Sequence, residues 1–100
     1  MAVIELNSDT FKAAISKGKS IVDFYATWCG PCKMLSPVVD AASEQYSDVK
    51  FYKVDIDKSM DIAMDYKIMS VPTLIVFEDG EPVNKSIGVI SGAELAELLK

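Results

Sequence analysis

The chain alternates short runs of β-branched and aromatic residues with segments whose apolar residues recur at helical spacing, which restricts it to an α/β fold. The early strands can be parallel with crossover helices, and the last two form an antiparallel hairpin. The sequence predicts a three-layer α/β/α sandwich with a central mixed β-sheet, in the order β-α-β-α-β-α-β-β-α, flanked by four helices. Strands are expected at 2–5, 20–26, 50–56, 72–77 and 81–88. Helices are expected within 7–19, from the second cysteine's turn through 46, at 60–67 and at 91–100.

Residues that start and stop secondary structure support this assignment. Ser91, followed three residues later by Glu94, forms a capping box. The pair Asp79-Gly80 predicts a tight hairpin turn. Other signals are a helix cap at Asn7 or Ser8, a helix stop at Gly18, a kink at Pro37 and an edge-strand position at Pro82. No repeat or linker divides the chain, so residues 1–100 are expected to form one domain.

Charge and residue types exclude several functions. The net charge is -5, and arginine and histidine are absent, so nucleic-acid binding is not expected. The absence of histidine also excludes Ser-His and Cys-His catalytic pairs and imidazole metal ligands. A chain of 100 residues buries roughly 60 to 65% of its unfolded surface, so its core needs no cross-link.

No targeting or membrane segment is recognised. The start "MAVIELNSD" lacks a basic region, and no apolar run exceeds four residues. We therefore expect a cytoplasmic protein with no membrane association; a mature secreted form is the alternative. In the cytoplasm a lone cysteine pair is more often catalytic or metal-binding than structural.

The two cysteines, Cys29 and Cys32, lie together in "DFYATWCGPCKMLSP". A zinc site needs about four ligands, which this pair reaches only by dimerisation or with carboxylates. As a structural disulfide it would close a small loop and stabilise little. The third interpretation, a redox-active pair, fits a CxxC near a βαβ pattern.

The position of the pair assigns a role to each sulfur. A strand leads into "WCGPC" and a helix follows, so Cys29 lies at the helix N-terminus, where the backbone favours the thiolate. Gly30 permits the turn and Pro31 presets the first helical turn. Cys29 is the expected nucleophile, which attacks a partner's disulfide, and Cys32 then resolves the mixed disulfide.

Asp23 places a carboxylate within "IVDFY", a run typical of a strand buried on both faces. Burial raises the pKa of a carboxyl group, so Asp23 is a candidate to exchange a proton with Cys32 near neutral pH. The alternative is an ordinary aspartate on a half-exposed face.

The segments "VDFYA", "WCGPC", "KMLSP", "VDID", "VPTL" and "EDG" resemble the thioredoxin family of the bacterial type over nearly the whole chain. The resemblance implies the same roles for Cys29, Cys32 and Asp23. It makes Lys53 a neighbour of Asp23 that modulates proton transfer and makes Pro72 a cis-proline facing the active site. It implies a substrate-binding surface of Trp28, Gly30, Pro31, Ile56, Val71, Pro72 and Gly88.

Without the motif, these residues would have simpler interpretations. Trp28, Ile56 and Val71 would be core residues, Gly88 a β-bulge and Lys53 a solvated charge. Met60, Met64 and Met69 look like a soft apolar patch, but their spacing is more simply that of residues filling packing gaps at a helix and a loop, and they are assigned no role. Tyr25 and Thr27 depart from the family pattern and are expected to shift partner preference.

The resemblance implies a general protein disulfide reductase, a thiol-disulfide oxidoreductase of electron transport and cell redox homeostasis. It implies a monomer with no bound cofactor or metal, which receives reducing equivalents from NADPH through thioredoxin reductase. Implied substrates are oxidised proteins of the ribonucleotide reductase, peroxiredoxin and methionine sulfoxide reductase type. The alternatives are a disulfide oxidase or isomerase, and a redox-inactive or chaperone-like binding subunit.

Overall fold

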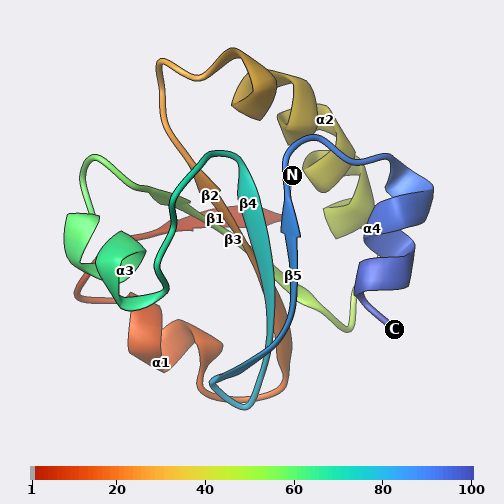
Figure 1. The fold of residues 1–100 in the computed structure, drawn as a ribbon. Coiled ribbons are helices and arrows are strands. Elements are labelled where there is room, and N and C mark those ends of the chain that lie inside the picture. The colour runs from red at the N-terminus through yellow and green to blue at the C-terminus, as the bar shows by residue number, and fades with distance from the viewer. Residues whose placement is uncertain (1) are drawn as a thin grey trace.

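The computed structural model describes residues 2–100, and a five-stranded mixed sheet runs through its centre (Figure 1). The strand order is β1-β3-β2-β4-β5. The strands are β1 (Val3–Leu6), β2 (Lys19–Tyr25), β3 (Lys50–Asp55), β4 (Thr73–Glu78) and β5 (Glu81–Ile87), and the helices are α1 (Phe11–Ile15), α2 (Gly30–Gln45), α3 (Met60–Asp65) and α4 (Gly92–Leu98).

Strands β1, β3 and β2 are parallel, whereas β4 is antiparallel to β2 and β5 is antiparallel to β4. Helices α1 and α2 provide the crossovers that parallel strands require. The predicted order of elements and the mixed sheet are therefore confirmed.

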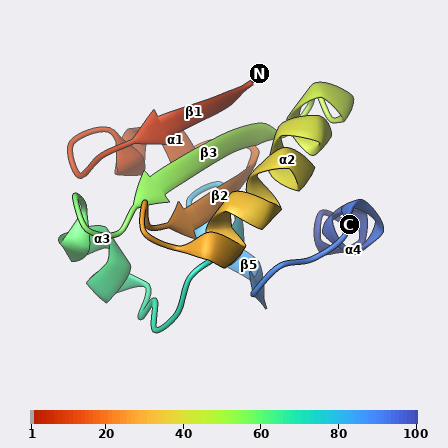
Figure 2. The same ribbon diagram turned by 90° about the horizontal axis from the view of Figure 1, so that it is seen from above.

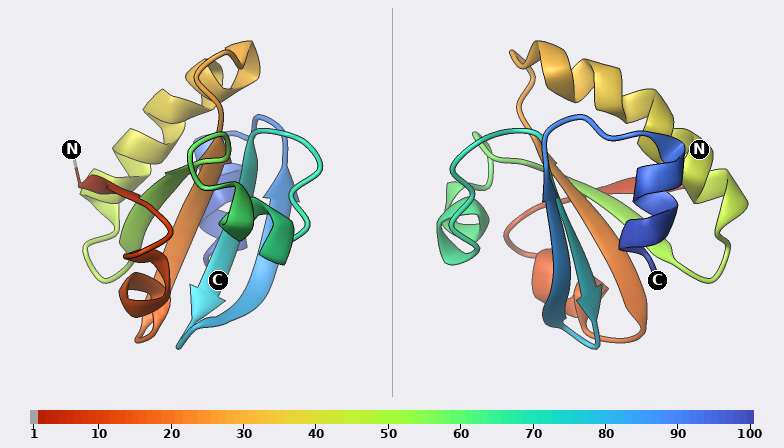
Figure 3. Two further views of the ribbon diagram at one scale, coloured as in Figure 1. Left: turned by 90° about the vertical axis from the view of Figure 1, so that its left-hand side faces the viewer. Right: turned by 45° about the vertical axis from the view of Figure 1, so that its right-hand side comes forward.

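The helices cover both faces of the sheet: α1 and α3 lie on one side, and α2 and α4 on the other (Figures 2 and 3). Alternate residues of β2 feed the two cores, because successive strand residues point to opposite faces. Val22 and Phe24 pack with α1 and α3, and Ile21 packs with Leu35 of α2. Asp23 shares the face of Ile21 and therefore lies on the α2 side of the sheet.

The predicted hairpin turn and the predicted capping box both form as expected. Asp79 and Gly80 both have positive φ, 50° and 87°, and turn the chain from β4 into β5. At the start of α4, the Glu94 N–H donates to the Ser91 Oγ at 3.1 Å, and the Ser91 N–H donates to the Glu94 Oε1 at 3.0 Å. Pro82 lies in β5, which is an edge strand.

Asn7 makes the capping bonds that the sequence predicted, but one turn before the regular α-helix begins. The Asn7 Oδ1 accepts hydrogen bonds from the backbone N–H groups of Asp9 and Thr10 at 2.9 and 3.1 Å, so Asn7 stabilises a turn that precedes the helix. Helix α1 then begins after Thr10, whose side chain forms no capping bond. It ends at Ile15, before Gly18. Helix α2 continues through Pro37, and the kink expected there stays a prediction.

Candidate active site

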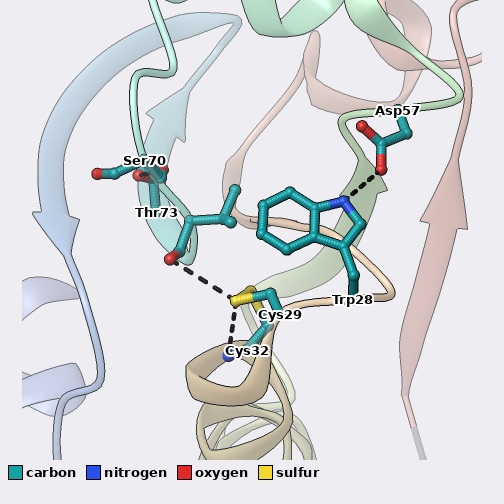
Figure 4. The surroundings of a disulfide bond; sticks show 7 residues. Trp28, Cys29, Cys32, Asp57, Ser70 and Thr73 are labelled. Carbon is teal, nitrogen blue, oxygen red and sulfur yellow. Dashed lines mark hydrogen bonds between the residues drawn. A yellow bond between two sulfur atoms is a disulfide. The ribbon is translucent and has the colours of Figure 1, made fainter.

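Cys29 and Cys32 form a disulfide at the point where β2 has ended and α2 begins (Figure 4). Their Cα atoms lie 5.3 Å apart. Cys29 is the N-cap residue of α2, and Gly30 and Pro31 occupy the first helical positions. The strand–CGPC–helix pattern thus places the pair where the sequence predicted it.

The N-terminus of α2 is directed at the Cys29 sulfur. The Cys32 N–H donates to the Cys29 Sγ at 3.1 Å, which uses one of the backbone donors that a helix leaves unpaired at its start. In the reduced protein, the same donor and the positive end of the helix dipole favour a thiolate at Cys29. Both cysteines are only 4% exposed, so a substrate must approach them closely.

The loop before β4 faces the pair from the opposite side. The Cys29 Sγ lies 3.7 Å from the carbonyl oxygen of Val71, and the peptide bond between Val71 and Pro72 is cis, as the resemblance implied. The Gly88 N–H donates to the Pro72 carbonyl at 2.9 Å. These contacts bring Val71, Pro72 and Gly88, which are far apart from Cys29 in the sequence, to one end of the sheet.

Trp28 is 69% exposed and lies beside the disulfide, so its interpretation as a core residue is wrong. Its indole Nε1–H donates to the Asp57 Oδ2 at 2.8 Å (Figure 4). The backbone N–H of Asp57 in turn donates to the Asp55 Oδ1 at 2.9 Å. Asp57 was missed as a site residue, although "VDID" was part of the resemblance.

Ile56 and Val71 pack against the cysteine pair as partly buried side chains. The methionine prediction is wrong, because Met60, Met64 and Met69 are 63, 75 and 91% exposed and fill no core gap. They line a surface hollow that also includes Ile56 and Asp57.

Asp23 is 6% exposed, and within residues 2–100 its Oδ1 has no hydrogen-bond partner. Burial raises the pKa of its carboxyl group to about 7, while the positive charge of Lys53 opposes the rise and the negative charge of Asp40 adds to it. Asp23, Lys53 and Cys32 line one open cavity of about 340 Å³. The prediction that Asp23 is buried is therefore correct, and a shared cavity connects Asp23 with Cys32.

Lys53 lies beside Asp23 in the sheet, as its register partner on β3. Its ammonium group lies 5.7 Å from the centre of the Tyr25 ring. The Tyr25 hydroxyl donates to the Glu5 Oε2 at 2.8 Å. Sequence reasoning did not find Glu5, because nothing in the local pattern of the first strand indicates which strand pairs with it.

Within the described residues, 2–100, no three cysteine or acidic side chains are grouped as a metal ion would require. No helix in that part of the chain is long and apolar enough to cross a membrane.

The family model described as Thioredoxin matches residues 2–100 of the chain. A thioredoxin from Staphylococcus epidermidis is 44% identical over 100 residues, which cover 99% of this chain and 96% of the relative. A thioredoxin from Staphylococcus aureus is 42% identical with the same coverage.

Two solved structures have the same fold. A thioredoxin from Malassezia sympodialis superimposes with a TM-score of 0.90 at 33% identity, covering 98% of this chain and 91% of its own. A mutant thioredoxin from Halobacterium salinarum NRC-1 has a TM-score of 0.89 at 35% identity, covering 97% of this chain and 87% of its own.

Proposed function

This chain belongs to the thioredoxin family and is a thiol-disulfide oxidoreductase, and we propose that it acts as a general protein disulfide reductase. The observation that carries the proposal is the Cys29–Cys32 pair at the N-terminus of α2, with the Cys32 N–H donating to the Cys29 sulfur. That arrangement stabilises a thiolate at one sulfur and keeps the second within reach of it.

In the first step, the Cys29 thiolate attacks one sulfur of a substrate disulfide. A bond forms between the Cys29 Sγ and that sulfur, and the other substrate sulfur leaves as a thiolate that takes a proton from solvent. The N-cap position supports Cys29 as the nucleophile, because the helix N-terminus stabilises its negative charge.

In the second step, Cys32 must lose its proton before it attacks the Cys29 sulfur. Asp23 is the proposed acceptor, because it lines the same cavity as Cys32 and has a pKa of about 7, so both of its protonation states are populated near neutrality. The new Cys29–Cys32 disulfide releases the second substrate thiolate. The substrate gains two electrons and the enzyme loses two.

We propose that substrates dock on the surface around Cys29. Trp28, Gly30 and Pro31 are exposed on one side of the pair, and the segments of Val71–Pro72 and Gly88 meet on the other. The Val71 carbonyl can accept a backbone hydrogen bond from an extended substrate. Ile56 adds apolar area next to the cysteines.

By family likeness, the proposed electron donor is a thioredoxin reductase that uses NADPH. The proposed substrates are oxidised proteins such as ribonucleotide reductase, peroxiredoxin and methionine sulfoxide reductase. We also propose that the protein is cytoplasmic and monomeric. In the catalytic cycle, Lys53 modulates the proton transfer at Asp23.

Dithiothreitol-driven reduction of insulin disulfides tests the activity. Cys29→Ser is expected to abolish catalysis, and Cys32→Ser is expected to accumulate a mixed disulfide with insulin through Cys29, visible by mass spectrometry. Ala41→Ser, on the exposed face of the same helix, is the matched control. Full activity of Cys29→Ser would refute the assigned nucleophile.

The reduction potential of the pair tests the direction of catalysis. We expect Trp28 fluorescence in defined glutathione buffers to report a potential below the cytosolic glutathione poise, about −220 to −260 mV by biochemical extraction. A value near that of strong thiol oxidants would instead identify an oxidase.

A further inference from the structure

Three charged residues form one row across the parallel part of the sheet. Glu5 of β1 is the register partner of Lys53 of β3, and Lys53 is the register partner of Asp23 of β2. Register partners in parallel strands point to the same face. Lys53 is therefore placed between two carboxylates, one at the surface and one buried.

Tyr25 contacts the surface carboxylate of this row. It lies two residues after Asp23 on β2, on the same face, and its hydroxyl donates to the Glu5 Oε2 at 2.8 Å. Burial, followed by this hydrogen bond and the negative charge of Glu5, raises the pKa of the Tyr25 hydroxyl, so the hydroxyl keeps its proton and remains a donor.

The ammonium group of Lys53 lies at the ring of Tyr25 rather than at a carboxylate. It is 5.7 Å from the ring centre, and within residues 2–100 the ion pairs closer than about 4 Å join Lys19 to Glu78 and Lys100 to Glu97. A cation at this distance from the ring is attracted by the electron-rich ring face. From there its positive charge still acts on Asp23.

Other charged and titratable groups also surround this row. Asp40 of α2 adds negative charge at Asp23, and Asp55 of β3 adds negative charge at Tyr25. Lys33 and Cys32 of α2 line the same cavity. On the other side of Asp23, β4 contributes Leu74, which has no charge. Within the row itself, Lys53 is the one cation between two acids.

We propose that Tyr25 and Glu5 are positioning residues: their hydrogen bond holds the Glu5 carboxylate away from Lys53 and leaves Lys53 to Asp23, which sets the proton affinity of Asp23 during disulfide exchange. This inference rests on the proposed function of Asp23 as the proton acceptor for Cys32. Tyr25 thereby acquires a role in the rate of mixed-disulfide resolution, besides any effect on partner preference.

Removing the Tyr25 hydroxyl gives a directional prediction. In Tyr25→Phe the ring remains, but the Glu5 carboxylate is freed to compete for Lys53 from the adjacent strand. The ammonium group moves away from Asp23, and the pKa of Asp23 rises. A displacement of a few ångströms at an effective dielectric constant of about 20 corresponds to an increase of about 0.5 to 1 pKa unit.

The test is a carbon-13 NMR titration of the Asp23 carboxyl group in the oxidised protein, where the cysteines do not titrate. Tyr25→Phe is expected to raise the pKa by that amount. Adding Glu5→Gln is expected to cancel the increase, because a neutral amide does not compete for the ammonium group. In a Lys53→Met background, Tyr25→Phe is expected to have no effect.

Tyr52→Phe is the matched control, since the Tyr52 hydroxyl donates to the Ala14 carbonyl on the opposite face of the sheet. It is expected to leave the pKa of Asp23 unchanged. The proposal is overturned if the pKa of Asp23 stays the same or falls in Tyr25→Phe. It is also overturned if Tyr25→Phe changes that pKa equally with and without Lys53.

A kinetic measurement adds a quantity that would not change if Tyr25 had a purely structural role. The pH profile for resolution of the mixed disulfide is expected to shift upward in Tyr25→Phe by the same amount as the NMR pKa. If the pKa shifts and the profile does not, the coupling of Lys53 to Asp23 stands and the proton-transfer role of Asp23 is refuted. The titration needs no disulfide-reducing activity, so its failure is distinguishable from failure of the proposed function.

Discussion

Replacing Asp23 with asparagine is expected to stabilise the protein, by an amount that depends on pH. Asparagine has nearly the shape of aspartate and resembles its neutral form, so Asp23→Asn removes the cost of a buried negative charge without opening a cavity. Asp23 is only 6% exposed, and burial is the largest cause of its raised pKa, so that cost is large.

The magnitude follows from the pKa of Asp23 in the two states. Folding raises it from 3.8 to about 7. Between these values, the unfolded chain has lost the proton and the folded protein still holds it, so the free energy of unfolding falls as pH rises. A difference of about three units corresponds to about 4 kcal/mol above pH 7, and less than about 1 kcal/mol at pH 4.

Urea denaturation of the oxidised protein, followed by far-UV circular dichroism at pH 4 and pH 8, measures this difference. At pH 8 the variant's midpoint is expected to lie about 2 to 3 M above that of the native protein. At pH 4 the two midpoints are expected to be close. The exposed Asp48→Asn serves as the control for removing a carboxylate as such.

Equal midpoints at pH 8 would refute the argument, because they would mean that Asp23 ionises in the folded protein without penalty. A stabilisation of the same size at both pH values would also refute it, since the effect would then come from packing. The expected result implies that the protein gives up stability at neutral pH to keep a proton-exchanging group beside Cys32.

Three further changes test other parts of the structure. Ser91→Ala removes the hydroxyl that accepts the Glu94 N–H and is expected to cost about 1 kcal/mol in urea denaturation; no loss would mean that the cap does not stabilise α4. Leu35→Ala empties a fully buried position between α2 and the sheet and is expected to cost about 3 kcal/mol, and a loss below about 1 kcal/mol would contradict its core assignment. Asp57→Ala removes the acceptor of the Trp28 indole, and fluorescence anisotropy is expected to fall as the ring gains freedom; unchanged anisotropy would show that Asp57 does not restrain it.

Local features that depend on a few neighbouring residues could be predicted from the sequence. The hairpin turn at Asp79-Gly80 requires positive φ, and the capping box at Ser91 depends on a side chain three residues away. Helix α2 begins at Gly30, just after Cys29, where a strand is followed by Gly30, Pro31 and an amphipathic run.

The first helix shows how far local reasoning reaches. Asn7 could bond either to a helix N-terminus or to a separate turn, and the two outcomes use the same side-chain oxygen and neighbouring N–H groups. The sequence alone does not show how many residues after Asn7 the regular α-helix begins. The exposed methionines were misjudged for a related reason, since their spacing does not reveal that the groove beside α3 faces solvent.

The sequence by itself determined the chemistry and its position: a cysteine pair at a helix start, and an acid in a strand that is buried on both faces. Tertiary structure alone decided what surrounds that acid. Because β3 lies between β1 and β2, Lys53 lies between Glu5 and Asp23, and Tyr25 reaches Glu5. Strand order follows from how crossover connections and helices pack over the whole sheet, so these contacts between distant residues have no local signature.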